Sequence, residues 1–73
     1  MADARVETEP LLRWFASDHL AEHLRPIVYS YRVQALWLVE TLPRSAERTV
    51  ALRKLIESKD AAVRAAVETD TNG

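Results

Sequence analysis

Two long segments with helical spacing of apolar residues are separated by a short break, Leu42-Pro43-Arg44-Ser45. Before the break, apolar residues recur every three or four positions, at Leu20, Leu24, Val28, Tyr31, Ala35, Leu38 and Leu42. A half-buried strand would alternate with a period of two, so this spacing predicts one long amphipathic helix over residues 19–42. Pro26 lacks an N–H and disfavours helical geometry at Arg25, so the helix is either kinked there or begins there.

The segment after the break predicts a second long helix, over residues 46–67. Ser45 is a good N-cap, and Glu47 lies in the first turn, where the positive end of the helix dipole favours acids. Upstream, Thr8 or Glu9 ahead of Pro10 predicts the start of a short helix over residues 10–16. The expected fold class is all-α, with this short N-terminal helix followed by a long antiparallel two-helix hairpin, and residues 1–73 forming a single domain.

A chain of 73 residues without cysteine can bury only a small core, and no disulfide can reinforce it. Such a core rarely supplies more than about 3 to 5 kcal/mol. The run Ala35-Leu36-Trp37-Leu38-Val39 is apolar on every side, which is more than one partner helix can cover. We therefore expect a homo-oligomer that buries this run. Residues 1–8 and 69–73 show no apolar period, and we expect them to be flexible.

Composition excludes several classes of protein. The N-terminal ten residues are polar, and no apolar run approaches the roughly 20 residues that a bilayer needs, so we expect a cytoplasmic protein with no membrane partner. The absence of cysteine excludes thiol catalysis and thiolate zinc sites. No Ser/His/Asp set, glycine-rich phosphate loop or carboxylate pair is present, so we expect neither an enzyme nor a cofactor.

One metal-binding pattern does occur. The run His19-Leu20-Ala21-Glu22-His23 matches H-x-x-E-H, in which two histidines hold zinc and the glutamate activates water. That chemistry also needs a third ligand and a substrate cleft, which a chain this small does not offer. We interpret both histidines as surface or interface residues and expect no metal site.

Basic residues outnumber acidic ones between residues 10 and 67, although the formal net charge of the chain is −1. The excess lies in one segment and consists of Arg44, Arg48, Arg53, Lys54, Lys59 and Arg64. Guanidinium groups bind phosphate oxygens in pairs and stack on bases, so this segment predicts a phosphate-binding face. The alternative is a solvated helix face, with local pairs such as Arg53 with Glu57 and Asp60 with Arg64. The excess is too small for binding duplex DNA.

Aromatic residues provide a second candidate for ligand binding. Trp14 and Phe15 lie in the short N-terminal helix, where they could form a stacking surface beside Arg13 and Arg25. Nucleobases are bound in this way, with cations on the phosphates. Packing in the core or in an interface is the alternative. We favour packing for Trp37 and leave both interpretations open for Trp14 and Phe15.

The stretch from Leu42 to Glu57 resembles the signature of a phage family of small helical hairpins. The shared positions follow one another without a gap and are Pro43, Ser45, Glu47, Arg48, Thr49, Val50-Ala51-Leu52, Leu55 and Glu57. The family comprises the cyclic-oligonucleotide sponges that phages use against CBASS, and the same hairpin occurs in sponges that act against Thoeris. The resemblance covers about residues 14–67. The sequence departs from the family at Ala46, where relatives have arginine, and lacks their asparagine within Ala61–Ala65.

The resemblance implies a homo-oligomer, often a hexamer, that binds cyclic di- or trinucleotide messengers between subunits and does not cleave them. It implies that bases are stacked by Trp14 and Phe15, with Arg25 and Tyr29 on the same messenger. It also implies that Arg48 and Thr49 from several subunits contact the phosphates of another messenger. The expected function is therefore anti-CBASS sequestration in the host cytoplasm. A competing hypothesis is an oligomeric helical-hairpin adaptor or regulator that binds another protein.

Overall fold

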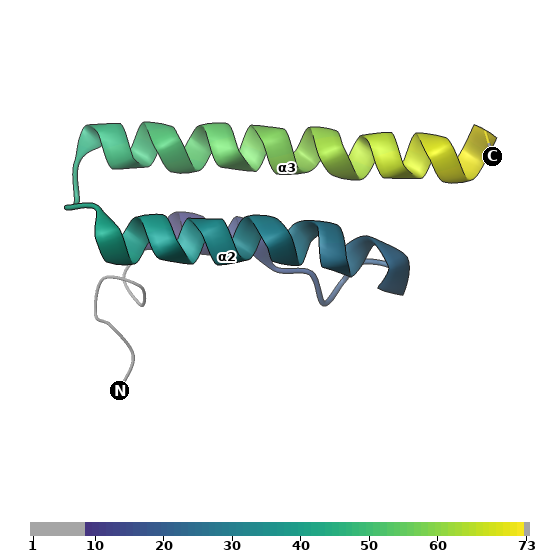
Figure 1. The fold of residues 1–73 in the computed structure, drawn as a ribbon, viewed down its shortest axis with the longest axis horizontal. Coiled ribbons are helices and arrows are strands. Elements are labelled where there is room, and N and C mark those ends of the chain that lie inside the picture. Colours follow the sequence, from purple (N-terminus) through teal and green to yellow (C-terminus); the bar gives the residue numbers. More distant parts are fainter. Residues whose placement is uncertain (1–8, 73) are drawn as a thin grey trace.

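The computed structural model describes residues 9–72, and within them the chain forms a helical hairpin. The elements, in order, are the 3₁₀ helices η1 (Pro10–Phe15) and η2 (Glu22–Leu24) and the α-helices α2 (Arg25–Thr41) and α3 (Ala46–Asn72). Helices α2 and α3 lie antiparallel on either side of the turn at residues 42–45, and η1 contacts both of them (Figure 1). The predicted all-α hairpin with a short N-terminal piece is confirmed.

The long first helix is shorter than the sequence predicts, because α2 begins at Arg25 rather than at residue 19. Of the two alternatives at Pro26, a kink or a start, the start is correct. Proline is tolerated in the first helical turn, where its missing N–H has no intrahelical partner. The Arg25 side chain holds the preceding loop in place, since it donates hydrogen bonds to the carbonyls of Leu20 (Nε–O 3.1 Å) and Asp18 (Nη2–O 3.4 Å).

The other two elements also differ at their ends from the prediction. The N-terminal piece is a 3₁₀ helix that ends at Phe15, and the Glu9 carboxylate caps it by accepting a hydrogen bond from the Leu11 N–H (3.3 Å). Helix α3 continues past Val67 to Asn72, because no glycine or proline interrupts that stretch. The backbone of residues 69–72 belongs to α3, and residues 1–8 and 73 lie outside the described part of the chain, so the expected flexibility of both ends stays a prediction.

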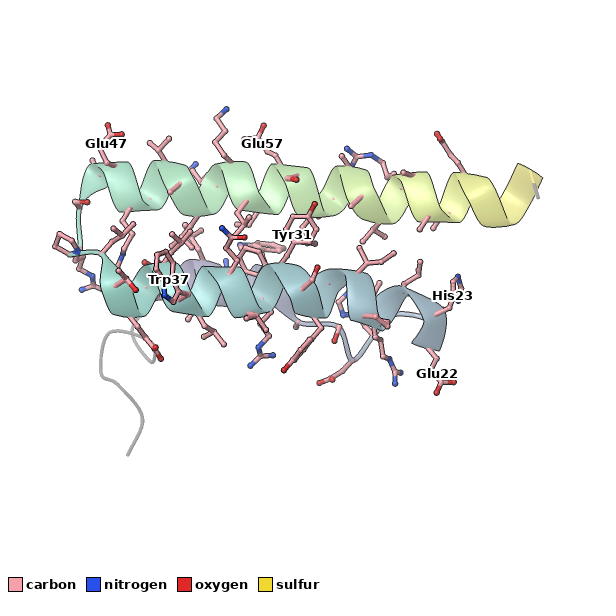
Figure 2. All side chains as sticks on the ribbon, viewed as in Figure 1. Glu22, His23, Tyr31, Trp37, Glu47 and Glu57 are labelled. Atoms are coloured by element: carbon pink, nitrogen blue, oxygen red, sulfur yellow. The ribbon has the colours of Figure 1, made fainter. Side chains whose placement is uncertain are left out.

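The core lies where η1, α2 and α3 meet. Its fully buried cluster consists of Phe15, Ala35, Val39 and Leu52, one or two from each element. Burying such side chains contributes about 1.5 to 3 kcal/mol for each large apolar residue. Tyr31 lies between the two long helices, and its hydroxyl and that of Ser58 are 2.9 Å apart, so one hydrogen bond links α2 to α3 (Figure 2).

A large apolar surface remains on the side of α2 away from its buried residues. Tyr29, Val33 and Trp37 follow one another at intervals of four and are 63%, 49% and 58% exposed. We call these three residues the outer face of α2. The apolar run at residues 35–39 is thus divided: Ala35 and Val39 are buried within the chain, and Trp37 is not. In the described part of the chain, no helix is long and apolar enough to cross a membrane.

Candidate functional site

The six predicted ligand-binding residues do not form one cluster. Arg48 and Thr49 lie beside the turn that closes the hairpin, in the first turn of α3. Arg25 and Tyr29 lie at the opposite end, where α2 begins. Trp14 and Phe15 lie on η1. Each pair has to be considered separately.

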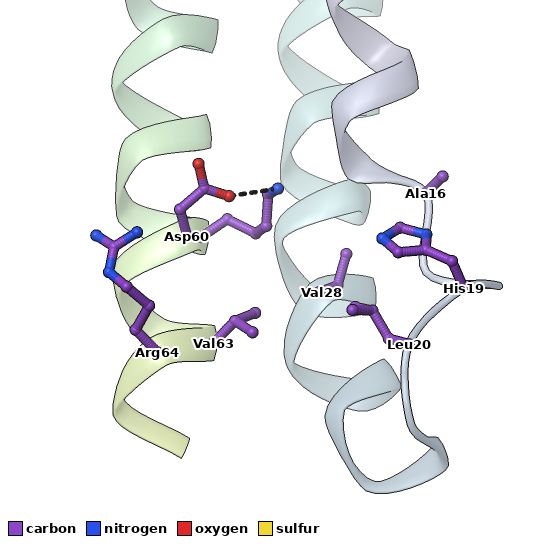
Figure 3. A pocket seen from close by; sticks show the side chains of 8 residues that line it. Ala16, His19, Leu20, Val28, Asp60, Val63 and Arg64 are labelled. Carbon is purple, nitrogen blue, oxygen red and sulfur yellow. Dashed lines mark ion pairs between the residues drawn. The ribbon is translucent and has the colours of Figure 1, made fainter. Parts of the chain in front are cut away.

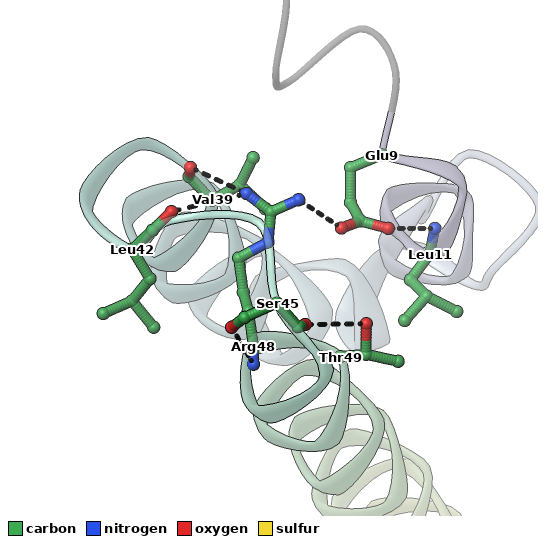
Figure 4. Close-up of polar contacts among 7 residues, drawn as sticks. All are labelled: Glu9, Leu11, Val39, Leu42, Ser45, Arg48 and Thr49. Atoms are coloured by element: carbon green, nitrogen blue, oxygen red, sulfur yellow. Dashed lines mark hydrogen bonds and ion pairs between the residues drawn. The ribbon is translucent and has the colours of Figure 1, made fainter.

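Arg48 is the most buried charged residue in the described part of the chain, with 1% of its surface exposed. Its Nη2 lies 2.8 Å from Oε1 of Glu9, whose side chain is 7% exposed. Its Nη1 donates longer hydrogen bonds, of 3.4 Å each, to the carbonyl oxygens of Val39 and Leu42 (Figure 4). Those carbonyls belong to the end of α2, where no intrahelical N–H is left to satisfy them. Arg48 therefore ties the segment before η1 and the end of α2 to α3.

The turn beside Arg48 is held by a conventional cap. The Ser45 hydroxyl accepts a hydrogen bond from the Arg48 N–H (3.1 Å), which confirms the predicted N-cap. The Thr49 hydroxyl donates to the Ser45 carbonyl (3.3 Å). In the single chain, both predicted phosphate ligands of this pair are thus engaged in the hairpin turn. Glu9, the partner of Arg48, is missed by sequence reasoning because 39 residues separate the two and no local spacing links them.

Phe15 conflicts with the role implied for it. It is fully buried among Ala35, Val39 and Leu52, so its ring offers no face to a base. The reason is that η1 packs into the angle between α2 and α3 and must fill it with its largest inward side chain. Arg25 is exposed but serves the loop before α2, as described above. Tyr29 is exposed on the outer face of α2.

Trp14 is the predicted residue that best fits a ligand site. Half of its surface is exposed, and the guanidinium carbon of Arg13 lies 5.1 Å from its ring centroid, within the range of a cation–π contact. A groove of about 390 Å³ runs between η1 and α3 beside this ring, lined by Leu11, Trp14, Arg53, Ile56 and Glu57. We call it the Trp14 groove. It places an aromatic ring, two apolar side chains and a guanidinium around one space.

The acids of α3 pair with lysines rather than with the arginines that the sequence suggests. Lys54 Nζ lies 3.4 Å from Oε2 of Glu57, and Lys59 Nζ lies 2.6 Å from Oδ1 of Asp60. Glu57 points away from α2, at the outer edge of the Trp14 groove (Figure 2). Because the lysines take these carboxylates, no described residue forms an ion pair with Arg53. Its guanidinium remains available in the groove.

Comparisons with protein-family models, curated proteins and solved structures found no match. Among the described side chains, those of residues 9–68, no three His, Cys, Asp or Glu residues are grouped so as to hold a metal ion. His19 and His23 are both exposed.

Proposed function

We propose that this protein sequesters cyclic di- or trinucleotide messengers of bacterial antiviral defence, as an anti-CBASS sponge, and does not hydrolyse them. The observation that carries the proposal is the Trp14 groove, in which a half-exposed indole lies against Arg13 and faces a space that Arg53 also lines. A base stacked on an aromatic ring gains about 1 to 3 kcal/mol, and a guanidinium binds phosphate oxygens through two parallel hydrogen bonds.

The size of the groove supports binding between subunits. At about 390 Å³ it lies near the lower end of the roughly 300 to 1,000 Å³ that small-molecule sites occupy. A messenger of two or three nucleotides is large for such a space, and most of its surface would stay in water. A second subunit that covers the groove would supply the missing wall.

The outer face of α2 supports the homo-oligomer that this requires. Tyr29, Val33 and Trp37 are aromatic or β-branched, and a hollow of about 330 Å³ between Val33 and Trp37 is otherwise lined by the uncharged Ser30 and Gln34. Exposed apolar patches with aromatic residues and without charges are typical of protein–protein interfaces. None of the residues that line this hollow is charged, so two copies of it can pack against each other without burying a charge from its lining.

The same face also favours the competing function. A stripe of Tyr29, Val33 and Trp37 suits an amphipathic helix of a different protein as well as a second copy of α2. An adaptor or regulator of this kind would need the outer face of α2 and would not need the Trp14 groove. The two functions therefore predict different sensitive residues.

Calorimetry with cyclic di-AMP, 3′,3′-cyclic GMP–AMP and cyclic tri-AMP tests the sponge. We expect at least one of them to bind and to be recovered intact after the protein is heated. Trp14→Ala should weaken binding by roughly 5- to 150-fold, the equivalent of one base stack. Arg53→Gln should weaken it by about tenfold or more, as expected for a charged hydrogen bond. Arg64→Gln is the matched control, because Arg64 lies on the same side of α3 but does not line the groove.

The calorimetry separates the sponge from the adaptor, and it separates the Trp14 groove from other binding places on the chain. Absence of heat with every messenger would reject the sponge and leave the adaptor. Binding that Trp14→Ala and Arg53→Gln leave unchanged would reject the Trp14 groove as its place. The sequence predicts that binding depends on Arg48 more than on Arg53 or Lys54, because Arg48 lies near the positive N-terminal end of α3. Its burial leads us to expect instead that Arg48→Ala acts through folding.

A further inference from the structure

A second cleft lies at the open end of the hairpin, far from the turn at residues 42–45. It has a volume of about 240 Å³ and is lined by Ala16, His19, Leu20, Val28, Lys59, Asp60, Val63 and Arg64. Three segments meet there: the loop between η1 and η2, the start of α2, and α3 (Figure 3). We call it the open-end cleft. None of its lining residues belongs to the Trp14 groove.

Lys59 is unusual among the exposed charges of α3. Its side chain is only 12% exposed, whereas that of Lys54 is 73% exposed, although each lysine pairs with one carboxylate. A surface lysine ordinarily extends its ammonium into water. Lys59 instead keeps its ammonium inside the cleft, where the dashed line in Figure 3 marks its contact with Asp60.

The ammonium of Lys59 has donors to spare. An ammonium has three N–H donors, and in the described part of the chain Asp60 is the one group found to interact with Lys59. Lys59 lines the cleft, so its remaining donors can reach a group bound there. An ammonium forms shorter and stronger hydrogen bonds with an anionic oxygen than with a neutral one, which favours an anion.

The other residues that line the cleft are of two kinds, apolar residues on one side and a histidine and an arginine elsewhere. Leu20, Val28 and Val63 form an apolar side, and the His19 imidazole points from its loop toward α2 (Figure 3). Arg64 lies at the outer rim beside Asp60, and no described residue forms an ion pair with it. Lys59 and Asp60 largely neutralise each other, so the excess positive charge of the lining comes from Arg64 at the rim, whose guanidinium points to the outer side of α3 (Figure 3).

We propose that the open-end cleft binds a small phosphorylated ligand no larger than a mononucleotide, with Lys59 contacting the phosphate. Arg64 adds charge at the rim, Asp60 holds the ammonium in position, and the apolar side contacts the remainder of the ligand. A volume of about 240 Å³ is below the usual range for drug-sized ligands and smaller than the Trp14 groove, so the cleft suits a ligand smaller than a cyclic di- or trinucleotide. This site is therefore separate from the proposed messenger site and does not depend on it.

The test is a two-dimensional ¹H–¹⁵N NMR titration of the full chain with AMP, with inorganic phosphate and with adenosine. We expect AMP and phosphate to shift the amide resonances of residues 16–28 and 59–64, and adenosine to shift them much less. Lys59→Gln should raise the apparent Kd for AMP by about tenfold or more, and Arg64→Gln should raise it severalfold. Lys54→Gln is the matched control and should change nothing. Arg64→Gln should melt like the wild type, because Arg64 is exposed. The Lys59 side chain is only 12% exposed, so a melting curve of Lys59→Gln separates a loss of stability from a loss of binding.

Three outcomes would overturn the proposal. The first is the absence of saturable shifts with AMP or phosphate up to about 10 mM, where a site with a Kd of 1 mM would be mostly occupied. The second is binding that Lys59→Gln leaves unchanged. The third is AMP shifting the Trp14 indole resonance in place of the cleft residues. Arg53→Gln separates the two sites, since it should weaken messenger binding and leave AMP binding at the open-end cleft intact.

Discussion

Arg48 and Arg53 lie five residues apart on α3, yet their surroundings are opposite. Arg48 is 1% exposed and bonded to Glu9 and to two carbonyls of the hairpin. Arg53 is exposed, lines the Trp14 groove and pairs with no described residue. Five residues turn the helix by about 140°, because each residue adds about 100°. The turn of the helix therefore decides which arginine supports the fold and which can reach a ligand.

The comparison shows that a buried charge affects mainly stability, whereas an exposed charge remains available to a ligand. A buried ion pair gains strong attraction but loses the hydration of both partners, so removing one partner leaves an uncompensated charge in the interior. An exposed arginine adds little stability and keeps its hydrogen-bonding capacity for a ligand. Arg48 also has a cost of its own, since its Nε is buried without a hydrogen-bond partner in the described part of the chain.

The largest expected effect concerns folding. Arg48→Met and Glu9→Ala should each lower the free energy of unfolding by about 3 to 5 kcal/mol, because each leaves one member of the buried pair alone. The double variant should lose less than the two single losses added together, since its partners are removed at the same time. Urea unfolding followed by circular dichroism measures these differences where a transition remains, and a variant that loses all of its stability should lack the helical signal without urea.

Arg53→Met is the control for this comparison, and it should change stability by less than about 0.5 kcal/mol, as an exposed substitution does. The claim that Arg48 supports the fold would be wrong if Arg48→Met keeps the stability of the wild type but loses messenger binding. Arg48 would then be a ligand, as the resemblance implies, and the contact with Glu9 would be incidental.

The next effect concerns assembly through the outer face of α2, on which the proposed homo-oligomer depends. Trp37→Glu should convert the proposed oligomer to monomers, because it places a charge on the outer face of α2, and a tryptophan that acts as an interface hot spot costs about 2 kcal/mol or more when it is removed. The sequence alone predicts that this variant also largely unfolds. At 58% exposure, Trp37 lies outside the core of the single chain, so we now expect the monomer to stay helical.

Light scattering and circular dichroism on the same sample measure both properties. Val50→Glu is a suitable control, because Val50 is also apolar and 45% exposed but lies on α3. It should leave the subunit number unchanged. A well-folded wild-type monomer at micromolar concentration would reject the assembly and, with it, the closed form of the groove.

The hairpin itself is readable from the sequence because its signals are local. Apolar spacing indicates both long helices, and the Ser45 cap and the Pro43 break locate the turn between them. The ends of the two long helices are harder to predict, because local sequence rules allow the helix either to continue or to stop there. Pro26 allows either a kink or a start, and the stretch after Val67 lacks both an apolar period and a helix breaker.

The candidate site is readable only in part, because exposure is a tertiary property. Trp14 and Phe15 are adjacent and chemically alike, yet one ring is half exposed and the other fully buried. The burial of Arg48 depends on Glu9, a residue that the helical pattern does not relate to it. Residue type indicates that a cation or ring is present, and only packing determines which way it faces.

The smallest expected effect is a change in messenger affinity when Glu57 is replaced. Its direction tests whether the exposed charges of the Trp14 groove act on the ligand. Glu57 lies at the outer edge of the Trp14 groove and would repel a phosphate that Arg53 attracts, although Lys54 offsets part of its charge. Glu57→Gln should therefore tighten messenger binding by about twofold, since two unit charges about 4 Å or more apart in water interact by roughly 1 kcal/mol or less. The gain should disappear near 1 M salt, where the Debye length falls to about 3 Å. Stability should change by only a few tenths of a kcal/mol, because the pair with Lys54 is exposed. Glu47→Gln removes the same charge from α3 outside the groove, so calorimetry should find binding unchanged. If Glu57→Gln weakens binding instead, the carboxylate contacts the ligand directly, and the phosphate does not lie beside Arg53.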